Sequence, residues 1–333
     1  MKRPQWTESL RSYENGQTAR SLLQLASSVL PYLALGFLMH LALIRSWPYW
    51  VVLLLSLPAA GFLVRTFILQ HDCGHGSFFR SRVANSIVGS ICGFLTFTPY
   101  FDFKKSHAMH HGTVANLDRR GAGDVWTMTL DEYCSAPPLT RFVYRAVRNP
   151  FFFFLVLPPL IFVLFNRFPQ KYSGRRELLS ILLTDLVVAA AVYLTIRTVG
   201  FGAYVAVQGP TIYFASMAGV WLFFIQHQYE NVYWAHDADW DPIRASLEGS
   251  SFYDLPPVLR FFSGNIGFHH IHHLDSRIPN YRLKQCNDAT EQARSVHPIG
   301  LWEGFRSLSL HLWDESTGKL VRFRGARKKA GRA

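Results

Sequence analysis

Long stretches without a charged residue are the feature that most limits how this chain can fold. No Asp, Glu, Lys or Arg interrupts residues 21–44, 46–64 or 198–229. A helix that crosses a bilayer needs about 20 mostly apolar residues, and these stretches are long enough. Charged residues make up only 17% of the chain, against roughly 25% in soluble domains. The sequence therefore predicts an integral membrane protein built from helices.

The basic residues indicate which parts of the chain face the cytoplasm. The net charge is +12, and Lys and Arg concentrate near both ends and between residues 71 and 177. Such clustering follows the positive-inside rule, and basic residues beside a membrane also attract anionic headgroups. We therefore expect a lipid bilayer as partner and no nucleic acid. Six apolar segments can be distinguished: 22–44, 48–70, 83–101, 150–166, 178–198 and 204–226.

Three histidine clusters lie in the polar blocks between these segments. They read HDCGH at 71–75, HAMHH at 107–111 and HHIHH at 269–273. Residues three or four apart share one face of a helix, so each cluster would direct its rings to one side. Imidazole suits iron, copper, zinc and nickel. The candidate ligands are too many for one ion and fit two: His71, His75, His107, His110, His111, His269, His272 and His273.

Several further residues are candidates for a role at this centre. His227 ends the last apolar segment and is a ninth candidate ligand, with an ordinary interfacial histidine as the alternative. His270 lies about 100° around the helix from its neighbour and is expected to be supporting or structural. Carboxylates near the clusters could orient the imidazoles, with surface or capping roles as the alternative for each. These carboxylates are Asp72, Asp124, Glu230, Asp237 and Asp241.

The clusters can meet only if they lie on one side of the membrane. Segment 83–101 separates the first two clusters and so cannot cross. Like the second non-spanning segment identified below, it is expected to be re-entrant or to lie at the membrane interface. Three segments separate the second cluster from the third, and an even number of these three must cross. Segment 150–166 is the best candidate to stay on one side, because Pro158-Pro159 would break or kink a straight helix in its middle and basic residues flank both ends.

We expect an all-α, single-domain protein with both termini in the cytoplasm. Its parts would be an N-terminal segment 1–21, four spanning helices in two hairpins (22–44, 48–70, 178–198, 204–226), a helical cap 227–320 holding the metal site, and a basic tail 321–333.

The three clusters, in this order and with membrane segments between them, resemble the boxes of the membrane-bound fatty acid desaturases. HDCGHGSFF at 71–79 is similar to the acyl-lipid branch, which includes Δ12/ω6 enzymes, and GNIGFHHIHHLDSRIPNYRL at 264–283 to bacterial acyl-lipid members. QHQYENVYWAHDADWD at 226–241 resembles the stretch before the third box, with His227 where the family carries an extra ligand. The resemblance implies a di-iron centre, oxygen as co-substrate, and electrons from an external ferredoxin or small haem cytochrome, with no haem or flavin in this chain.

The chain differs from the stearoyl-CoA branch of this family at one position. In that branch an Asn, four residues before the helix-end histidine, joins the site through a water. That position is Phe223 here, so the contact cannot form in the same way. Asn265, four residues before His269, is a candidate substitute or a cap of the helix that carries the third box.

The expected activity is insertion of a cis double bond into an acyl chain of a membrane lipid or a thioester. An unactivated methylene has no acidic proton, so a metal-based oxidant is needed. The clusters do not separate this outcome from a hydroxylase or related oxidase on the same scaffold. A metal transporter or sensor would need ligands deep in the bilayer and is disfavoured. We expect a multi-pass protein of a bacterial inner membrane.

Overall fold

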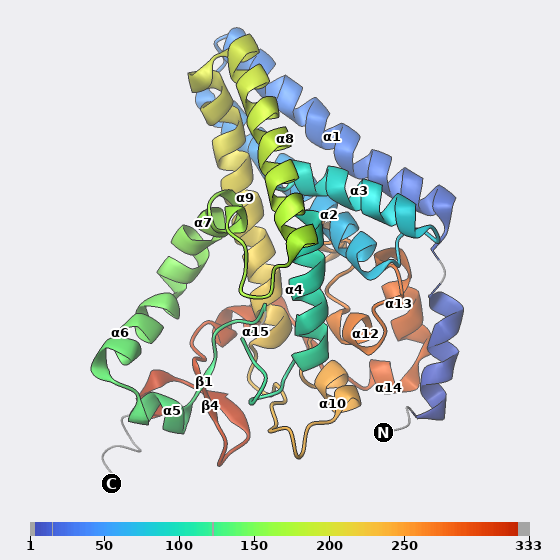
Figure 1. The fold of residues 1–333 in the computed structure, drawn as a ribbon, viewed down its shortest axis with the longest axis vertical. Coiled ribbons are helices and arrows are strands. Elements are labelled where there is room, and N and C mark those ends of the chain that lie inside the picture. The colour runs from blue at the N-terminus through green and yellow to red at the C-terminus, as the bar shows by residue number, and fades with distance from the viewer. Residues whose placement is uncertain (1–3, 15, 122, 326–333) are drawn as a thin grey trace.

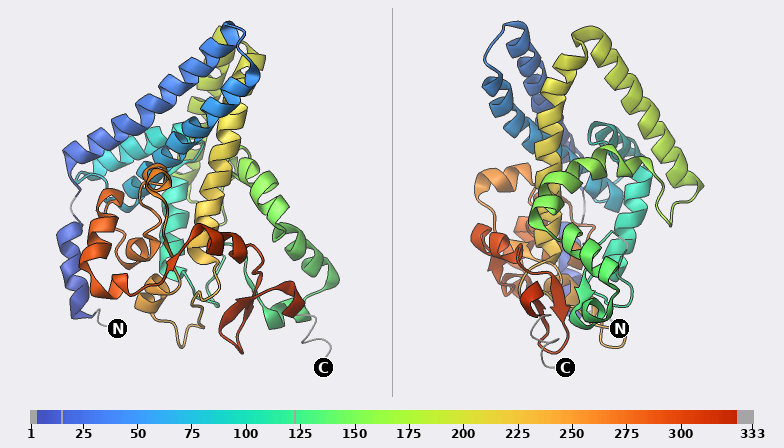
Figure 2. Two further views of the ribbon diagram at one scale, coloured as in Figure 1. Left: turned by 180° about the vertical axis from the view of Figure 1, so that it is seen from behind. Right: turned by 90° about the vertical axis from the view of Figure 1, so that its left-hand side faces the viewer.

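Two long helical hairpins form the frame of the molecule (Figure 1). A computed structural model of the chain describes residues 4–14, 16–121 and 123–325. The hairpin helices are α1 (Thr18–Ile44), α2 (Tyr49–His75), α8 (Arg175–Val199) and α9 (Phe201–His227). The tips of both hairpins lie at the same end of the molecule, and α2 packs against both α1 and α9 (Figures 1 and 2).

Among the described residues, α1, α2 and α8 are long and apolar enough to cross a membrane. Half of the most apolar part of α2 is buried, against 22% for α1 and 11% for α8, so α2 is central and the other two face outward. α9 has 27 residues and no Asp, Glu, Lys or Arg, and it contains Gln208, Pro210 and Thr211. By length and composition, the described residues contain three candidate spans, α1, α2 and α8, and a fourth if a bent pair of helices counts as one.

That bent pair covers the segment predicted at 150–166. α6 (Pro138–Val147) is followed by the π-helical turn η2 (Phe152–Val156), α7 (Leu157–Val163) and the short turn η3 (Phe165–Arg167), and the chain bends by 60° between α6 and Phe152–Arg167. The segment is not one straight α-helix: the π-helical turn η2 ends at Val156 and α7 begins at Leu157, directly before Pro158-Pro159. Both prolines stand in the first turn of α7, where a helix uses no backbone N–H and tolerates proline.

A shorter apolar helix, α3 (Arg82–Leu95), follows the first hairpin. Its 14 residues extend for about 21 Å, less than the roughly 30 Å of a bilayer core, so α3 alone cannot cross. α4 (Tyr100–Thr113) then descends beside α2 toward the lower half of the molecule (Figure 1).

The lower half of the molecule is a cap built from many short elements. Its helices are α5 (Leu130–Ser135), α10 (Pro242–Leu247), α11 (Pro257–Phe262), α12 (His269–Leu274), α13 (Asn280–Ala289), α14 (Glu291–Arg294) and α15 (Leu301–Ser307). Its strands are β1 (Met128–Thr129), β2 (Phe252–Tyr253), β3 (Pro298–Ile299), β4 (Leu312–Asp314) and β5 (Lys319–Val321).

These strands correct the prediction of an all-helical cap. One sheet has the order β1-β4-β5, with β1 parallel and β5 antiparallel to β4, and the other pairs β2 with β3 in parallel. Each strand has only two or three residues, too few for the alternating pattern that reveals a strand in a sequence.

The N-terminal segment lies against this cap. The 3-10 helix η1 (Gln5–Tyr13) buries Leu10 in a core cluster with Ile271, Leu274 and Ile278, which surround the third histidine cluster. Most of the expected basic tail lies outside the described residues, which end at Gly325.

Candidate metal centre

All three histidine clusters converge between the hairpins and the cap. His71 and His75 come from the end of α2, and α4, α12 and the end of α9 supply the others. The first histidine group contains His71, His75, His107, His111 and His272. The second histidine group contains His110, His227, His269 and His273. Within each group the candidate ligand atoms all lie within 4.8 Å of one another.

The helices explain how the second and third clusters each serve both groups. Neighbouring residues on a helix point about 100° apart, and His110 and His111 on α4 accordingly belong to different groups. The same division separates His272 from His273 on α12. α2 ends directly after His75, where Gly76 adopts a φ of 75° and closes the last turn, a conformation that glycine adopts without strain.

Most of the rings are buried, and burial favours the neutral form of an imidazole. The second group is entirely buried, whereas His75, His107 and His111 of the first group are partly exposed. Loss of hydration holds the pKa of His107 and His269 well below 6.5, and repulsion among the neighbouring imidazoles adds to this effect. The same two causes lower the pKa of His111, His272 and His273. Neutral imidazoles keep the lone pair that a metal needs.

The spacing of the ring nitrogens fits metal ions. An ion about 2.1 Å from each nitrogen would separate adjacent octahedral ligands by roughly 3.0 Å. The Nε2–Nε2 distances are 3.1 Å for His110–His227, 3.0 Å for His227–His269, 3.0 Å for His269–His273, 3.1 Å for His107–His111 and 3.0 Å for His111–His272. Nε2 of His75 is buried and has no hydrogen-bond partner among the described residues. The donor set and its spacing therefore fit two cations.

Three acceptors orient the rings from behind. Asp124 Oδ1 lies 2.6 Å from Nδ1 of His110, and Asp72 Oδ1 lies 3.3 Å from Nδ1 of His71. The carbonyl oxygen of Gly249 lies 3.1 Å from Nδ1 of His227. Such contacts fix the tautomer that leaves Nε2 free for a metal. Sequence reasoning named both carboxylates but missed Gly249, because no side chain marks a backbone acceptor.

The other carboxylates named from the sequence lie elsewhere. Asp237 bonds Asn116 and Arg119, and Asp241 caps α10 by accepting the N–H groups of residues 243 and 244. Glu230 is exposed in the turn after α9. Hydrogen bonds away from the centre therefore account for Asp237 and Asp241, and Glu230 is a surface residue.

Asn265 and His270 also bond outside the two groups. The side chain of Asn265 donates to the carbonyl of Asn280 at 3.1 Å. It neither reaches a histidine nor caps α12, whose first N–H groups receive no side-chain cap. His270 directs Nε2 to Oδ1 of Asn287 at 3.0 Å, and burial lowers the pKa of His270 to about 4. His270 is thus a structural residue of the cap.

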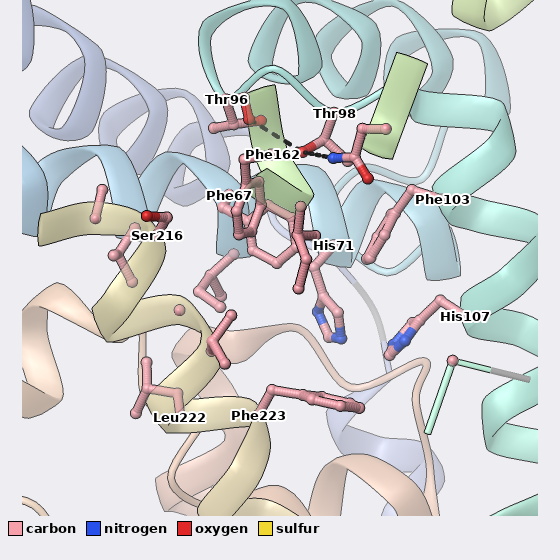
Figure 3. A pocket seen from close by; sticks show the side chains of 18 of the residues that line it. Phe67, His71, Thr96, Thr98, Phe103, His107, Phe162, Ser216, Leu222 and Phe223 are labelled. Carbon is pink, nitrogen blue, oxygen red and sulfur yellow. Dashed lines mark hydrogen bonds between the residues drawn. The ribbon is translucent and has the colours of Figure 1, made fainter. Parts of the chain in front are cut away.

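An apolar cavity of about 360 Å³ adjoins both histidine groups. Figure 3 shows the rings of His71 and His107 at its wall, with Phe67 and Phe162 close by and Phe223 on the opposite side. Phe223 packs 5.7 Å from the rings of both His110 and His227, measured between ring centroids. Apolar residues of spanning helices carry no distinctive signal, so the sequence did not reveal these walls.

Comparison with known proteins agrees with this geometry. Residues 45–304 match the family model described as fatty acid desaturase. The chain is 40% identical to a fatty acid desaturase of Bacillus subtilis (strain 168), an alignment that covers 97% of this chain and 91% of that protein. It is 26% identical to the sn-1 oleoyl-lipid 12-desaturase of a Synechocystis species, over 69% of this chain and 65% of that protein.

A further relative from Synechocystis, the sn-1 acyl-lipid omega-3 desaturase (ferredoxin), is 26% identical over 74% of this chain and 67% of its own length. The family match includes all three histidine clusters and the helices that carry them. The chain therefore belongs to the fatty acid desaturase family and is an oxidoreductase.

Proposed function

We propose that this desaturase inserts a cis double bond into an acyl chain of a membrane lipid, at two iron ions held by the first and second histidine groups. The observation that carries the proposal is the arrangement of nine imidazoles from four helices in two groups beside one apolar cavity. The proposed ligands are His71, His75, His107, His110, His111, His227, His269, His272 and His273.

The donor set and the family together favour iron. Several transition metals accept imidazole, but acyl desaturation is an oxidation that requires a redox-active ion. When bound, iron would use oxygen and external electrons to remove hydrogen from an unactivated methylene. We propose a ferredoxin or a small haem cytochrome as donor, and one Synechocystis relative is named as a ferredoxin desaturase.

The residues of the cavity would hold the acyl chain and keep water away. Phe67, Phe162 and Phe223 supply aromatic walls, which favour a hydrocarbon chain over water. Four histidines line the same cavity, two from each group. They are His71 and His107 of the first group and His110 and His269 of the second. A chain in this cavity would lie against both proposed irons, and such positioning of one carbon pair is what the reaction requires of the protein.

The convergence of the clusters supports the proposed topology. Because α4 and α12 meet at one centre, the chain between them must cross the membrane an even number of times. α8 and α9 form one antiparallel hairpin whose tip lies beside that of α1 and α2 (Figures 1 and 2). We propose that these four helices cross, that α3 and the 150–166 segment do not, and that the cap and both termini face the cytoplasm of a bacterium.

Lipid analysis of a heterologous host with a ferredoxin system tests the proposal. We expect a new double bond in membrane-lipid acyl chains when the protein is expressed, and none with the His110→Ala variant. A new hydroxyl group in place of the double bond would refute desaturation as the outcome. Unchanged lipids, from an iron-loaded protein given a competent donor, would refute the activity itself.

A further inference from the structure

The first histidine group is connected to a buried chain of polar side chains behind it. We propose that Asn280 and Gln24 are positioning residues that hold Asp72 against His71, an inference that rests on the proposed di-iron function. We call these four hydrogen-bonded residues the relay: Gln24, Asn280, Asp72 and His71.

Asp72 is the centre of the relay. Its Oδ2 accepts two hydrogen bonds from Asn280, one from the backbone N–H at 2.7 Å and one from Nδ2 at 2.8 Å. Its Oδ1 lies 3.3 Å from Nδ1 of His71. Asp72 is 1% exposed and Asn280 is fully buried. A buried carboxylate is stable only when its oxygens are bonded, so Asn280 is what allows a carboxylate at this position.

Gln24 in turn holds the side chain of Asn280. Nε2 of Gln24 donates to Oδ1 of Asn280 at 2.6 Å, and Nδ2 of Asn280 donates to Oε1 of Gln24 at 3.1 Å. The two protons of Nδ2 are thus divided between Gln24 and Asp72, and Oδ1 accepts from Gln24. Because a carboxylate only accepts hydrogen bonds, this pairing permits one orientation of the Asn280 amide.

The relay joins α2, which carries His71 and His75 of the first group, to α13 and α1. Asp72 is on α2 between His71 and His75, and Asn280 begins α13, seven residues after His273, the last residue of the third cluster. Asp72 therefore accepts an N–H at the start of α13, one that the helix itself leaves free. Gln24 is on α1, so the relay also ties the outer helix of the first hairpin to the centre.

The relay serves only one of the two groups. Asp124, the corresponding carboxylate of the second group, receives its other bond from the N–H of Gly121, three residues away in the same loop. A carboxylate that accepts Nδ1–H fixes the tautomer of a ligand histidine and increases its basicity. The relay should therefore control the metal of the first group and leave the metal of the second group unaffected.

The experiment uses the full chain, purified and loaded with ⁵⁷Fe(II), and measures iron affinity at each site by titration followed with Mössbauer spectroscopy. The variants are Asp72→Asn, Asn280→Ala and Gln24→Leu. The matched control is Asn85→Ala, because Asn85 is also a buried asparagine and bonds the backbone of Phe79 and Ser81. Thermal unfolding of every variant reports the structural cost separately.

We expect the first-site affinity to fall by about 10- to 100-fold in Asp72→Asn, the range typical of a lost outer partner. Asn280→Ala should cause a smaller fall, since its backbone N–H remains, and Gln24→Leu the smallest. The second-site signal should stay at the wild-type affinity in all three, and Asn85→Ala should change neither site. Equal losses at both sites, or wild-type affinity in Asn280→Ala, would overturn the relay. If the wild-type chain itself fails to bind two irons, the proposed function falls first and the relay with it.

Discussion

The two histidine groups consist of the same kind of side chain in different surroundings. The second group has four rings, all buried, with Asp124 and the carbonyl of Gly249 behind two of them. The first group has five rings, three of them partly exposed, and is supported by the relay through Asp72. The second group is held by the packed interior close to it, whereas the first depends on contacts that reach across α1, α2 and α13. This contrast predicts that the two metals respond differently to substitution.

The largest effects are expected when one ligand is removed from either group. His272→Ala removes a ring of the first group and His110→Ala a ring of the second. Because both proposed irons act on one acyl chain, each variant should lower desaturation at least ~100-fold, as loss of a group essential to chemistry does. Lipid profiling measures the activity, and metal analysis should show iron content falling below that of the wild type.

His270→Ala is the matched control for these two variants. His270 is adjacent to the third-cluster ligands on α12 but bonds Asn287. This variant should keep its iron and its activity wherever it folds. Full activity with unchanged iron in either ligand variant would contradict the assignment of that group.

A smaller effect is expected from the carboxylate of the second group. Asp124→Asn would replace the carboxylate 2.6 Å from Nδ1 of His110 by a neutral amide, whose single oxygen cannot take the place of both carboxylate oxygens, which now contact His110 and the N–H of Gly121. This change should weaken second-site iron binding by about 10- to 100-fold. The same site-resolved iron titration measures it. If Asp124→Asn instead lost iron at the first site and kept it at the second, the assignment of Asp124 to the second group would be wrong.

Narrowing the cavity should lower activity without releasing iron from either group. A Cβ added to Gly219 on α9 would lie 3.9 Å from the ring of Phe162, an ordinary contact. Gly219→Ala should therefore be tolerated, whereas the larger side chain of Gly219→Leu would fill acyl-chain space and lower the rate by roughly tenfold, within the range seen when a small group misfits an apolar pocket. Normal turnover by Gly219→Leu would show that substrate does not pass between α7 and α9.

The smallest effect concerns a histidine outside both groups. His236 lies between Asp118 and Glu315, each at 2.8 Å, and hydrogen bonds to these carboxylates raise the pKa of His236 above 6.5. Its stabilising contribution is thus complete below about pH 6.5 and is lost as the pH rises through the higher folded-state pKa.

The side chain of His236 is 52% exposed, so His236→Ala should lower the free energy of unfolding by less than about 1 kcal/mol. Thermal unfolding at low and high pH measures the difference between variant and wild type. A difference that is the same at both pH values would show that the charge on His236 contributes nothing.

The sequence was sufficient to name the nine histidines that the structure brings together, and insufficient for what surrounds them. The spacing within each cluster predicted rings on one helix face, and α2, α4 and α12 present them in that way. The division into two groups could not be predicted, since it depends on how helices distant in sequence approach one another. Asn280 and Asp72 are 208 residues apart, and no local pattern links them.

The same limit explains why some candidate residues lie away from the histidine groups. Asp237 and Asp241 follow His227 closely in the chain, but the loop after α9 turns them toward Arg119 and the start of α10. Asn265 was considered because of its spacing from His269, yet Asn265 adopts a φ of 60° and its side chain turns to Asn280. Proximity in sequence predicts proximity in space only within a regular element.

The most direct test of the account is the number and environment of the irons in the purified wild-type protein. Quantitative Mössbauer spectroscopy of the ⁵⁷Fe-loaded chain should show two irons per chain in two inequivalent, histidine-ligated sites of equal occupancy. Iron at only one site, or zinc filling both sites of an active enzyme, would contradict the claim that the two histidine groups form a di-iron centre.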